Sequence, residues 1–348
     1  MKFGYVLPHY PFDLICENAV LAEKIGFDSV WMTDHILGVG IKRWHCLEAW
    51  SVLSGLSSRT EKVTLGACVS DPHRRHPAVL AQMATTFDIM SGGRAVLGIG
   101  AGEAMNLDPY GIPWSKPVSR MREAITIIKK LWMEDSVNYN GEFFQLHEAF
   151  LSPEPVQKPH PPIWVAANSP RTMRIVAEMG DGWIPTAVVT SPNVYRENLG
   201  KIRSWAEKSG RNPSEIEPSI FLFTVAAEDE ETARGFAEFP AKILLALTPR
   251  LLKDYGVKLP SEELHISRLV FNPKTGQKLL EEIKEIPYKP IEDIFVFGTA
   301  DDCIGKLEKY VKAGTRHFLL SLFAPPKLSR SMIQFYADNV ISYFRNEK

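Results

Sequence analysis

The chain has 348 residues, of which 45% are hydrophobic and 23% charged, a balance typical of a globular protein. Its 40 Lys and Arg residues and 41 Asp and Glu residues give a net charge of -1, which argues against nucleic-acid binding through bulk positive charge. No run of 18 apolar residues predicts a membrane span. The four cysteines are too scattered to predict a disulfide framework or a zinc site. We therefore expect a cytoplasmic protein that contacts neither membrane nor nucleic acid and holds no metal.

Short runs rich in Val, Ile, Phe and Trp alternate with longer segments of helical period along the chain. This alternation is typical of βα units and a parallel sheet. The eight strands that we expect are residues 3–7, 29–33, 63–69, 95–100, 163–167, 182–185, 220–226 and 317–322. The helices expected between and after them are residues 14–25, 47–57, 77–90, 118–132, 170–179, 193–208, 229–247, 300–313 and 331–343.

Eight βα repeats predict an α/β fold of the (β/α)8 TIM-barrel type, rather than a doubly wound sheet or two stacked domains. We expect a single domain over residues 1–348, because no Pro-, Gly- or Ser-rich linker divides the chain. Two insertions interrupt the repeats. Residues 135–154 alternate in hydrophobicity around Asn140-Gly141, which predicts a β-hairpin. Residues 247–291 form an irregular, charged excursion, and such excursions after a barrel strand often cover the active site at the C-terminal face.

His35 and Glu103 follow the second and fourth expected strands, on the face where barrels carry their active sites. An imidazole titrates at about pH 6.5, and burial raises the pKa of a carboxyl group. Both side chains could therefore transfer protons near neutral pH. Each also has a structural interpretation. His35 could hydrogen-bond Asp34 or a loop carbonyl, and Glu103 could complement a helix dipole. Two titratable groups on nearby strand ends favour an acid–base pair.

Three other features lie at expected strand ends. Gly98, Gly100 and Gly102 match a dinucleotide fingerprint superficially, but they do not follow the first strand, so we interpret them as letting a flat ligand approach the backbone. The helix that opens at residues 168–170 could seat a phosphate on its free N–H groups or simply be capped by its serine. The basic run at residues 73–76 predicts a patch that faces solvent or binds an anion, rather than a metal site.

Several motifs in register resemble the bacterial luciferase-like oxidoreductases. They lie at residues 65–72, 75–78, 81–82, 91–94, 98–103, 164–167, 181–183 and 298–301. Within this superfamily, Asp34-His35 and the run from Gly102 to Asn106 resemble the branch that uses coenzyme F420, an 8-hydroxy-5-deazaflavin. That branch includes secondary alcohol dehydrogenases, glucose-6-phosphate dehydrogenases, methylenetetrahydromethanopterin reductases and phthiodiolone ketoreductases, and residues 109–120 are particularly similar to the ketoreductases.

The resemblance implies roles for individual residues. His35 and Glu103 would exchange the substrate proton, and Trp44 would replace a tryptophan that the family places at the position of Val39. The peptide between Cys68 and Val69 would be cis and would back the deazaflavin ring. The residues implied in cofactor binding are Asp34, Cys68, Val69, Ser70, Asp71, Ala101, Gly102, Asn106, Ala167, Asn168, Ser169 and Thr172, of which the last three would hold the phosphate.

The resemblance thus predicts an F420-dependent oxidoreductase that transfers a hydride between deazaflavin C5 and a small carbonyl compound or secondary alcohol. Val189 stands where the sugar-phosphate enzymes have a lysine, which argues against glucose 6-phosphate as the substrate. Three alternatives stay open: a methylenetetrahydromethanopterin reductase, an FMN-dependent monooxygenase and a barrel that binds flavin without catalysis. Relatives are commonly dimers, so we expect a homodimer that acts on a small molecule.

Overall fold

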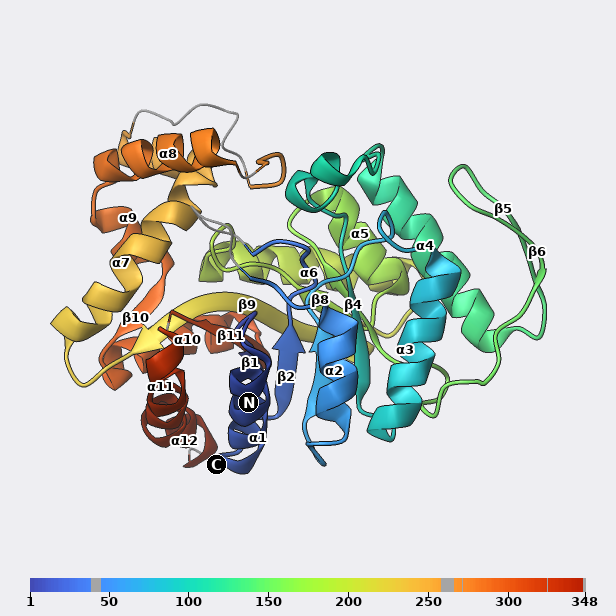
Figure 1. Ribbon diagram of the computed structural model, residues 1–348, viewed down its shortest axis with the longest axis horizontal. Helices are drawn as coiled ribbons and strands as arrows, with labels where there is room; N and C mark the ends of the chain where they lie inside the picture. Colours follow the sequence, from blue (N-terminus) through green and yellow to red (C-terminus); the bar gives the residue numbers. More distant parts are fainter. Residues whose placement is uncertain (39–44, 258–265, 271, 324, 347–348) are drawn as a thin grey trace.

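The elements of the protein are shown in Figure 1, a computed structural model that describes residues 1–38, 45–257, 266–270, 272–323 and 325–346. The strands are β1 (Lys2–Val6), β2 (Ser29–Met32), β3 (Thr64–Ala67), β4 (Ala95–Ile99), β5 (Val137–Asn140), β6 (Gln145–Ala149), β7 (Ile163–Ala166), β8 (Gly182–Ile184), β9 (Glu217–Ala226), β10 (Val296–Gly298) and β11 (His317–Leu322). The α-helices are α1 (Phe12–Lys24), α2 (Ala49–Ser57), α3 (Pro77–Ser91), α4 (Pro117–Met133), α5 (Pro170–Met179), α6 (Pro192–Lys208), α7 (Glu230–Ala246), α8 (Pro273–Glu282), α9 (Lys289–Ile294), α10 (Ala300–Ala313), α11 (Ser329–Tyr336) and α12 (Ser342–Asn346).

Eight parallel strands of these described residues close into a barrel, in the order β1, β2, β3, β4, β7, β8, β9 and β11. β1 pairs with both β2 and β11, and Gly182 of β8 pairs with Glu217 of β9. Helices flank the barrel (Figure 1), and none in the described ranges is both long and apolar enough to span a membrane. The predicted TIM barrel is confirmed, and each predicted strand is present with ends shifted by three residues or fewer.

Strand β10 is a ninth parallel strand among the described residues, and the sequence did not predict it. The long strand β9 pairs with β8 only near its start, and its Thr224 pairs with Val296 of β10 beyond the end of β8. Residues 296–298 show no alternation of apolar and polar side chains that would mark a strand.

The segment 247–291 contains two helices, α8 and α9, where it is described, so the prediction of an irregular segment was wrong. The side chain of Asn272 caps the start of α8. Leu279 and Ile291 pack with Phe297 of β10 in a second apolar cluster outside the barrel. Burial of this apolar surface stabilises the two helices against α7.

Two tryptophans from β2 and β7 fill the interior of the barrel. The rings of Trp31 and Trp164 lie 4.9 Å apart between centroids, within a cluster of side chains from the strands. Glycines on neighbouring strands make room for them. A Cβ atom at Gly66 would lie 2.4 Å from Cζ3 of Trp31, and one at Gly182 would lie 2.5 Å from Cγ of Trp164. The sequence therefore needs glycine at these two strand positions.

Gly66→Ala is expected to lower the free energy of unfolding by about 1–3 kcal/mol, because the new methyl group overlaps a fully buried indole. Urea unfolding measures the change. Gly200→Ala is the matched control, since an added Cβ at this position of α6 meets nothing within 4 Å, and it should stabilise the protein by about 0.5–1 kcal/mol. Equal effects of the two substitutions would contradict the packing argument.

The hairpin predicted around Asn140 is present, with β5 antiparallel to β6. Its tip packs against the first turns of two barrel helices. The ring of Phe144 lies 5.2 Å from that of His76 at the start of α3, and Arg120 of α4 stacks 4.6 Å from the ring of Phe143. Barrel helices begin at the C-terminal face of the strands, so the hairpin reaches toward that face from outside the barrel.

Candidate active site

The two predicted acid–base residues lie close together. His35 follows β2 and Glu103 follows β4, and Nε2 of His35 is 3.8 Å from Oε2 of Glu103. Nδ1 of His35 and Oε2 of Glu103 are buried and have no hydrogen-bond partner among the described residues. Buried polar atoms are normally hydrogen-bonded, so these two atoms mark a place where a ligand can supply the missing partners.

Burial controls the protonation of both groups. Burial, assisted by the positive charge of Arg74, lowers the pKa of His35 to about 4. Burial, assisted by the Asp71 carboxylate, raises the pKa of Glu103 to about 7. At pH 7 the imidazole is therefore neutral and the carboxyl group is about half protonated. The contact between them is not an ion pair, and Glu103 is the group suited to give or take a proton.

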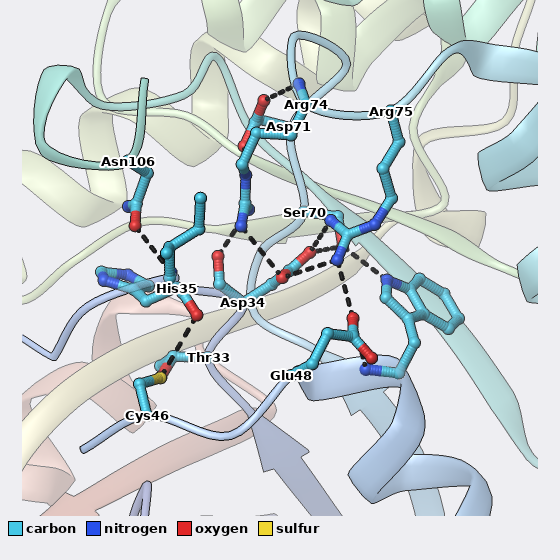
Figure 2. A network of polar contacts seen from close by, with 12 residues as sticks. Thr33, Asp34, His35, Cys46, Glu48, Ser70, Asp71, Arg74, Arg75 and Asn106 are labelled. Carbon is cyan, nitrogen blue, oxygen red and sulfur yellow. Dashed lines mark hydrogen bonds and ion pairs between the residues drawn. The ribbon is translucent and has the colours of Figure 1, made fainter. Parts of the chain in front are cut away.

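Asp34 lies at the centre of a buried polar network (Figure 2). Its carboxylate accepts hydrogen bonds from Ser70 Oγ at 2.6 Å, from Arg75 at 2.7 and 3.2 Å, and from Arg74 at 3.3 Å. The indole of Trp50 donates to Ser70 Oγ at 3.0 Å and extends the network to α2. Both carboxylate oxygens of Asp34 are thus used within the protein, and the roles of Asp34 and Ser70 toward a cofactor stay predictions.

In the basic run at residues 73–76, the two arginines are directed at carboxylates of the protein rather than at solvent, whereas His76 is exposed and binding of an external anion stays a prediction. Arg74 also donates to Asp71 at 2.5 Å, and Arg75 donates to Glu48 at 2.7 Å. The arginine side chains are only 8% and 15% exposed. In the described part of the chain, no three His, Cys, Asp or Glu side chains are placed to hold a metal ion.

The peptide bond between Cys68 and Val69, just after β3, is cis, as the resemblance implied. The glycines of the neighbouring β4 make room for this segment. A Cβ atom at Gly98 would lie 1.9 Å from the carbonyl oxygen of Ala67, and one at Gly100 would lie 2.6 Å from Cγ2 of Val69. Gly98 and Gly100 therefore accommodate the end of β3, and the role of the three glycines toward a flat ligand stays a prediction.

The loop that carries Glu103 is held by contacts with its neighbours. The side-chain oxygen of Asn106 accepts a hydrogen bond at 2.9 Å from the backbone N–H that follows His35 (Figure 2). The carbonyl of Ala101 accepts one at 3.0 Å from a tryptophan indole. Gly102 has a φ of 79°, a left-handed conformation that glycine adopts most easily. All three residues shape the loop, and their contacts with a cofactor stay predictions.

The start of α5 is a capping box formed by Ser169 and Thr172. Asn168 accepts a hydrogen bond at 3.2 Å from a backbone N–H after β8, and the buried Ala167 accepts one at 2.8 Å from a tryptophan indole. Because β7 pairs with β4, this helix start adjoins the loop that carries Glu103. The capping is observed, whereas the seating of a phosphate here stays a prediction.

His9, which follows β1, also lies beside His35. Its Nε2 hydrogen-bonds with Thr33 Oγ1, and its ring centroid is 6.3 Å from that of His35. Burial lowers the pKa of His9 to about 4, so a second neutral imidazole stands beside the first. Trp44, predicted to be catalytic, lies outside the described residues.

The described part of segment 247–291 contacts the loop that carries Glu103, and its covering of the site stays a prediction. The backbone N–H of Ala104 donates to the carbonyl of Ser267 at 3.0 Å. This hydrogen bond connects the segment to the residue that follows Glu103. A change in the segment can therefore alter the position of Glu103.

A (β/α)8 barrel that brings His35 and Glu103 together at the C-terminal ends of its strands has the architecture of barrel enzymes, and comparison with known proteins identifies its family. Residues 1–317 match the family model described as luciferase-like monooxygenase. The chain belongs to the luciferase-like family, which confirms the resemblance that the sequence motifs indicated.

Relatives of known name match along nearly the whole chain. A phthiodiolone/phenolphthiodiolone dimycocerosates ketoreductase of Mycobacterium tuberculosis (strain H37Rv) is 30% identical over 92% of this chain and 91% of its own length. An F420-dependent glucose-6-phosphate dehydrogenase of Microbacterium testaceum is 29% identical over 99% and 98%. A 5,10-methylenetetrahydromethanopterin reductase of Archaeoglobus fulgidus is 29% identical over 98% and 99%.

Solved structures share the fold. An F420-dependent secondary alcohol dehydrogenase in complex with an F420-acetone adduct has a TM-score of 0.82 at 24% identity, over 98% of both chains. The coenzyme F420-dependent tetrahydromethanopterin reductase of Methanopyrus kandleri has a TM-score of 0.78 at 22% identity, over 99% of both chains. These likenesses confirm the luciferase-like barrel.

Proposed function

We propose that the chain is an F420-dependent oxidoreductase that transfers a hydride between deazaflavin C5 and a small carbonyl compound or secondary alcohol. The observation that carries the proposal is the pair formed by His35 and Glu103, two partly buried side chains on nearby strand ends that each present a buried polar atom without a partner among the described residues. Relatives that use F420 by name support the choice of cofactor.

The residues around the pair fit a flat cofactor with a phosphate. The cis peptide after β3 and the loop at Gly102 would lie against the ring, and Ser169 with Thr172 would hold the phosphate at the start of α5. Nε2 of His73, beside Gly102, is a further buried polar atom without a partner in the described ranges. When bound, the cofactor supplies the hydride carrier at C5.

We assign the transfer of the substrate proton to Glu103. During ketone reduction its carboxyl group gives a proton to the substrate oxygen, and during alcohol oxidation its carboxylate takes the hydroxyl proton. A pKa of about 7 keeps both forms populated at neutral pH. His35 is neutral there, because its pKa is lowered to about 4, and it orients the oxygen through a hydrogen bond.

Equilibrium titrations of the purified protein with oxidised F420 and with FMN test the cofactor. We expect F420 to bind more tightly than FMN. We also expect turnover of secondary alcohols or ketones, measured as a change in the absorbance of oxidised F420. Preferential binding of FMN would assign the chain to the monooxygenases. Failure of both ligands to bind would contradict the proposal.

Reduction of 5,10-methylenetetrahydromethanopterin is a second candidate, because the reductase of Archaeoglobus fulgidus matches 98% of this chain. The same preparation with that substrate separates the two candidates. The ketoreductase relative supports a carbonyl group as the site of reduction. The cytoplasmic location and the homodimer stay predictions.

A further inference from the structure

Three phenylalanines form a row of rings at one side of the barrel mouth. Phe221 and Phe223 belong to β9, and Phe323 follows the end of β11. Phe221 and Leu319 of β11 pack in the interior cluster that contains the two barrel tryptophans, whereas Leu222 packs with the surrounding helices. Because side chains alternate along a strand, Phe223 and Phe323 face the barrel axis as well. We call Phe221, Phe223 and Phe323 the aromatic row.

Contacts among the rings hold the aromatic row in place. The rings of Phe221 and Phe223 lie 5.2 Å apart between centroids in an edge-to-face arrangement, and those of Phe223 and Phe323 are stacked at 5.4 Å. The backbone N–H of Phe323 donates to the carbonyl of Thr224 at 2.9 Å, which continues the pairing of β11 with β9. Phe223 and Phe323 also pack against the second apolar cluster, yet all three residues stay partly exposed. A contiguous apolar surface of this kind commonly marks a binding site.

The aromatic row lies across the barrel mouth from Glu103. In the closed ring of eight strands, β11 is four strands away from β4 in either direction, and Glu103 follows β4. His35 follows β2, which is separated from β11 by β1 alone. A substrate whose oxygen contacts His35 and Glu103 would therefore extend its remaining groups across the mouth toward the aromatic row.

Charge is distributed unevenly around the mouth. The loops that follow β2, β3 and β4 carry Asp34, Asp71, Arg74, Arg75 and Glu103. The runs that follow β8 and β11, residues 185–189 and 323–326, contain no Asp, Glu, Lys or Arg. These runs therefore offer no cation to a phosphate or carboxylate group of a substrate. Burial of apolar surface is the interaction that the aromatic row supplies.

We propose that the aromatic row binds an apolar substituent of the substrate, so that the chain acts on ketones or secondary alcohols with an alkyl or aryl group and discriminates against sugar phosphates. The inference rests on the proposed function. Each methylene buried against the rings should raise kcat/KM by about 4-fold, until the aromatic row is covered. The contact is the same in the bound substrate and in the transition state, so it should lower KM rather than raise kcat.

The test measures kcat/KM for a series of methyl ketones with alkyl groups of increasing length, in the wild type and in Phe323→Ala. We expect kcat/KM to rise with length in the wild type. The variant should lose about 5- to 15-fold for the longest ketone, through a higher KM, and the loss should shrink as the alkyl group shortens. Phe323→Leu keeps an apolar side chain and should recover part of the loss. Phe150→Ala is the matched control. This phenylalanine is 72% exposed after β6, on the other side of the barrel from β11 (Figure 1), and its removal should leave the series unchanged.

Equal losses for every ketone in Phe323→Ala would overturn the proposal, because the ring would then act on the fold or on the cofactor. A wild-type kcat/KM that is independent of alkyl length, or that is highest for glucose 6-phosphate, would overturn it as well. If the wild type does not bind F420, the proposed function fails, and calorimetry of a long-chain methyl ketone added to the protein alone decides on the aromatic row. Binding that Phe323→Ala weakens would support the aromatic row, and no binding would overturn it. Circular dichroism of each variant checks that it is folded.

Discussion

Glu103→Gln is expected to lower kcat for ketone reduction by about 10²- to 10⁴-fold, the usual contribution of a general acid. The amide keeps the size of the carboxyl group but cannot give up a proton at neutral pH, so the affinity for F420 should be unchanged. Steady-state turnover and a cofactor titration on the same preparation measure both quantities. Glu134→Gln, at the exposed end of α4, is the matched control and should alter neither. Wild-type turnover in the Glu103 variant would contradict the assignment.

The pH profile identifies the group that carries the proton. Reduction requires protonated Glu103, so its kcat/KM should fall as the pH rises through about 7. Oxidation requires the carboxylate and should become faster over the same range. Glu103→Gln should remove both inflections. An inflection near pH 4 instead would transfer the role to His35, whose pKa is lowered to about 4.

Local sequence patterns were enough to predict the barrel and the starts of its helices. The serine cap at the start of the helix near residue 170 was predicted because an N-cap and its partner lie within three residues of each other. The positions of His35 and Glu103 followed from strand ends, since parallel strands of a barrel bring their C-terminal ends to one face. The capping pattern and the strand ends each involve only a few neighbouring residues, so both can be recognised without knowledge of the rest of the fold.

Features that depend on contacts between distant residues could not be predicted in the same way. The burial of Arg74 depends on Asp34, which is 40 residues away and comes within reach only when β2 and β3 pair. The need for glycine at Gly98 depends on a carbonyl of the neighbouring strand. The pKa of Glu103 depends on how deeply its loop is buried, which no local pattern records.

Asp34→Asn should destabilise the apoprotein by about 3 kcal/mol, the lower end of the range for removing one partner of a buried ion pair. The amide leaves two arginines, 8% and 15% exposed, without the carboxylate that they share. The loss falls at the lower end because Arg74 keeps Asp71 and Arg75 keeps Glu48. Urea unfolding without cofactor measures the free energy, so a role in cofactor binding cannot contribute to the result.

Two controls separate a structural role of Asp34 from a role in cofactor binding. Glu154→Gln breaks an exposed ion pair with Lys158 and should leave the urea midpoint unchanged. Arg75→Met in the Asp34→Asn background removes one of the unpaired buried charges and should recover part of the lost stability. An Asp34→Asn protein that unfolds at the wild-type midpoint but no longer binds F420 would contradict the structural role of Asp34. Asp34 would then contact the cofactor directly, as the family resemblance implied, and the arginines would not depend on its charge.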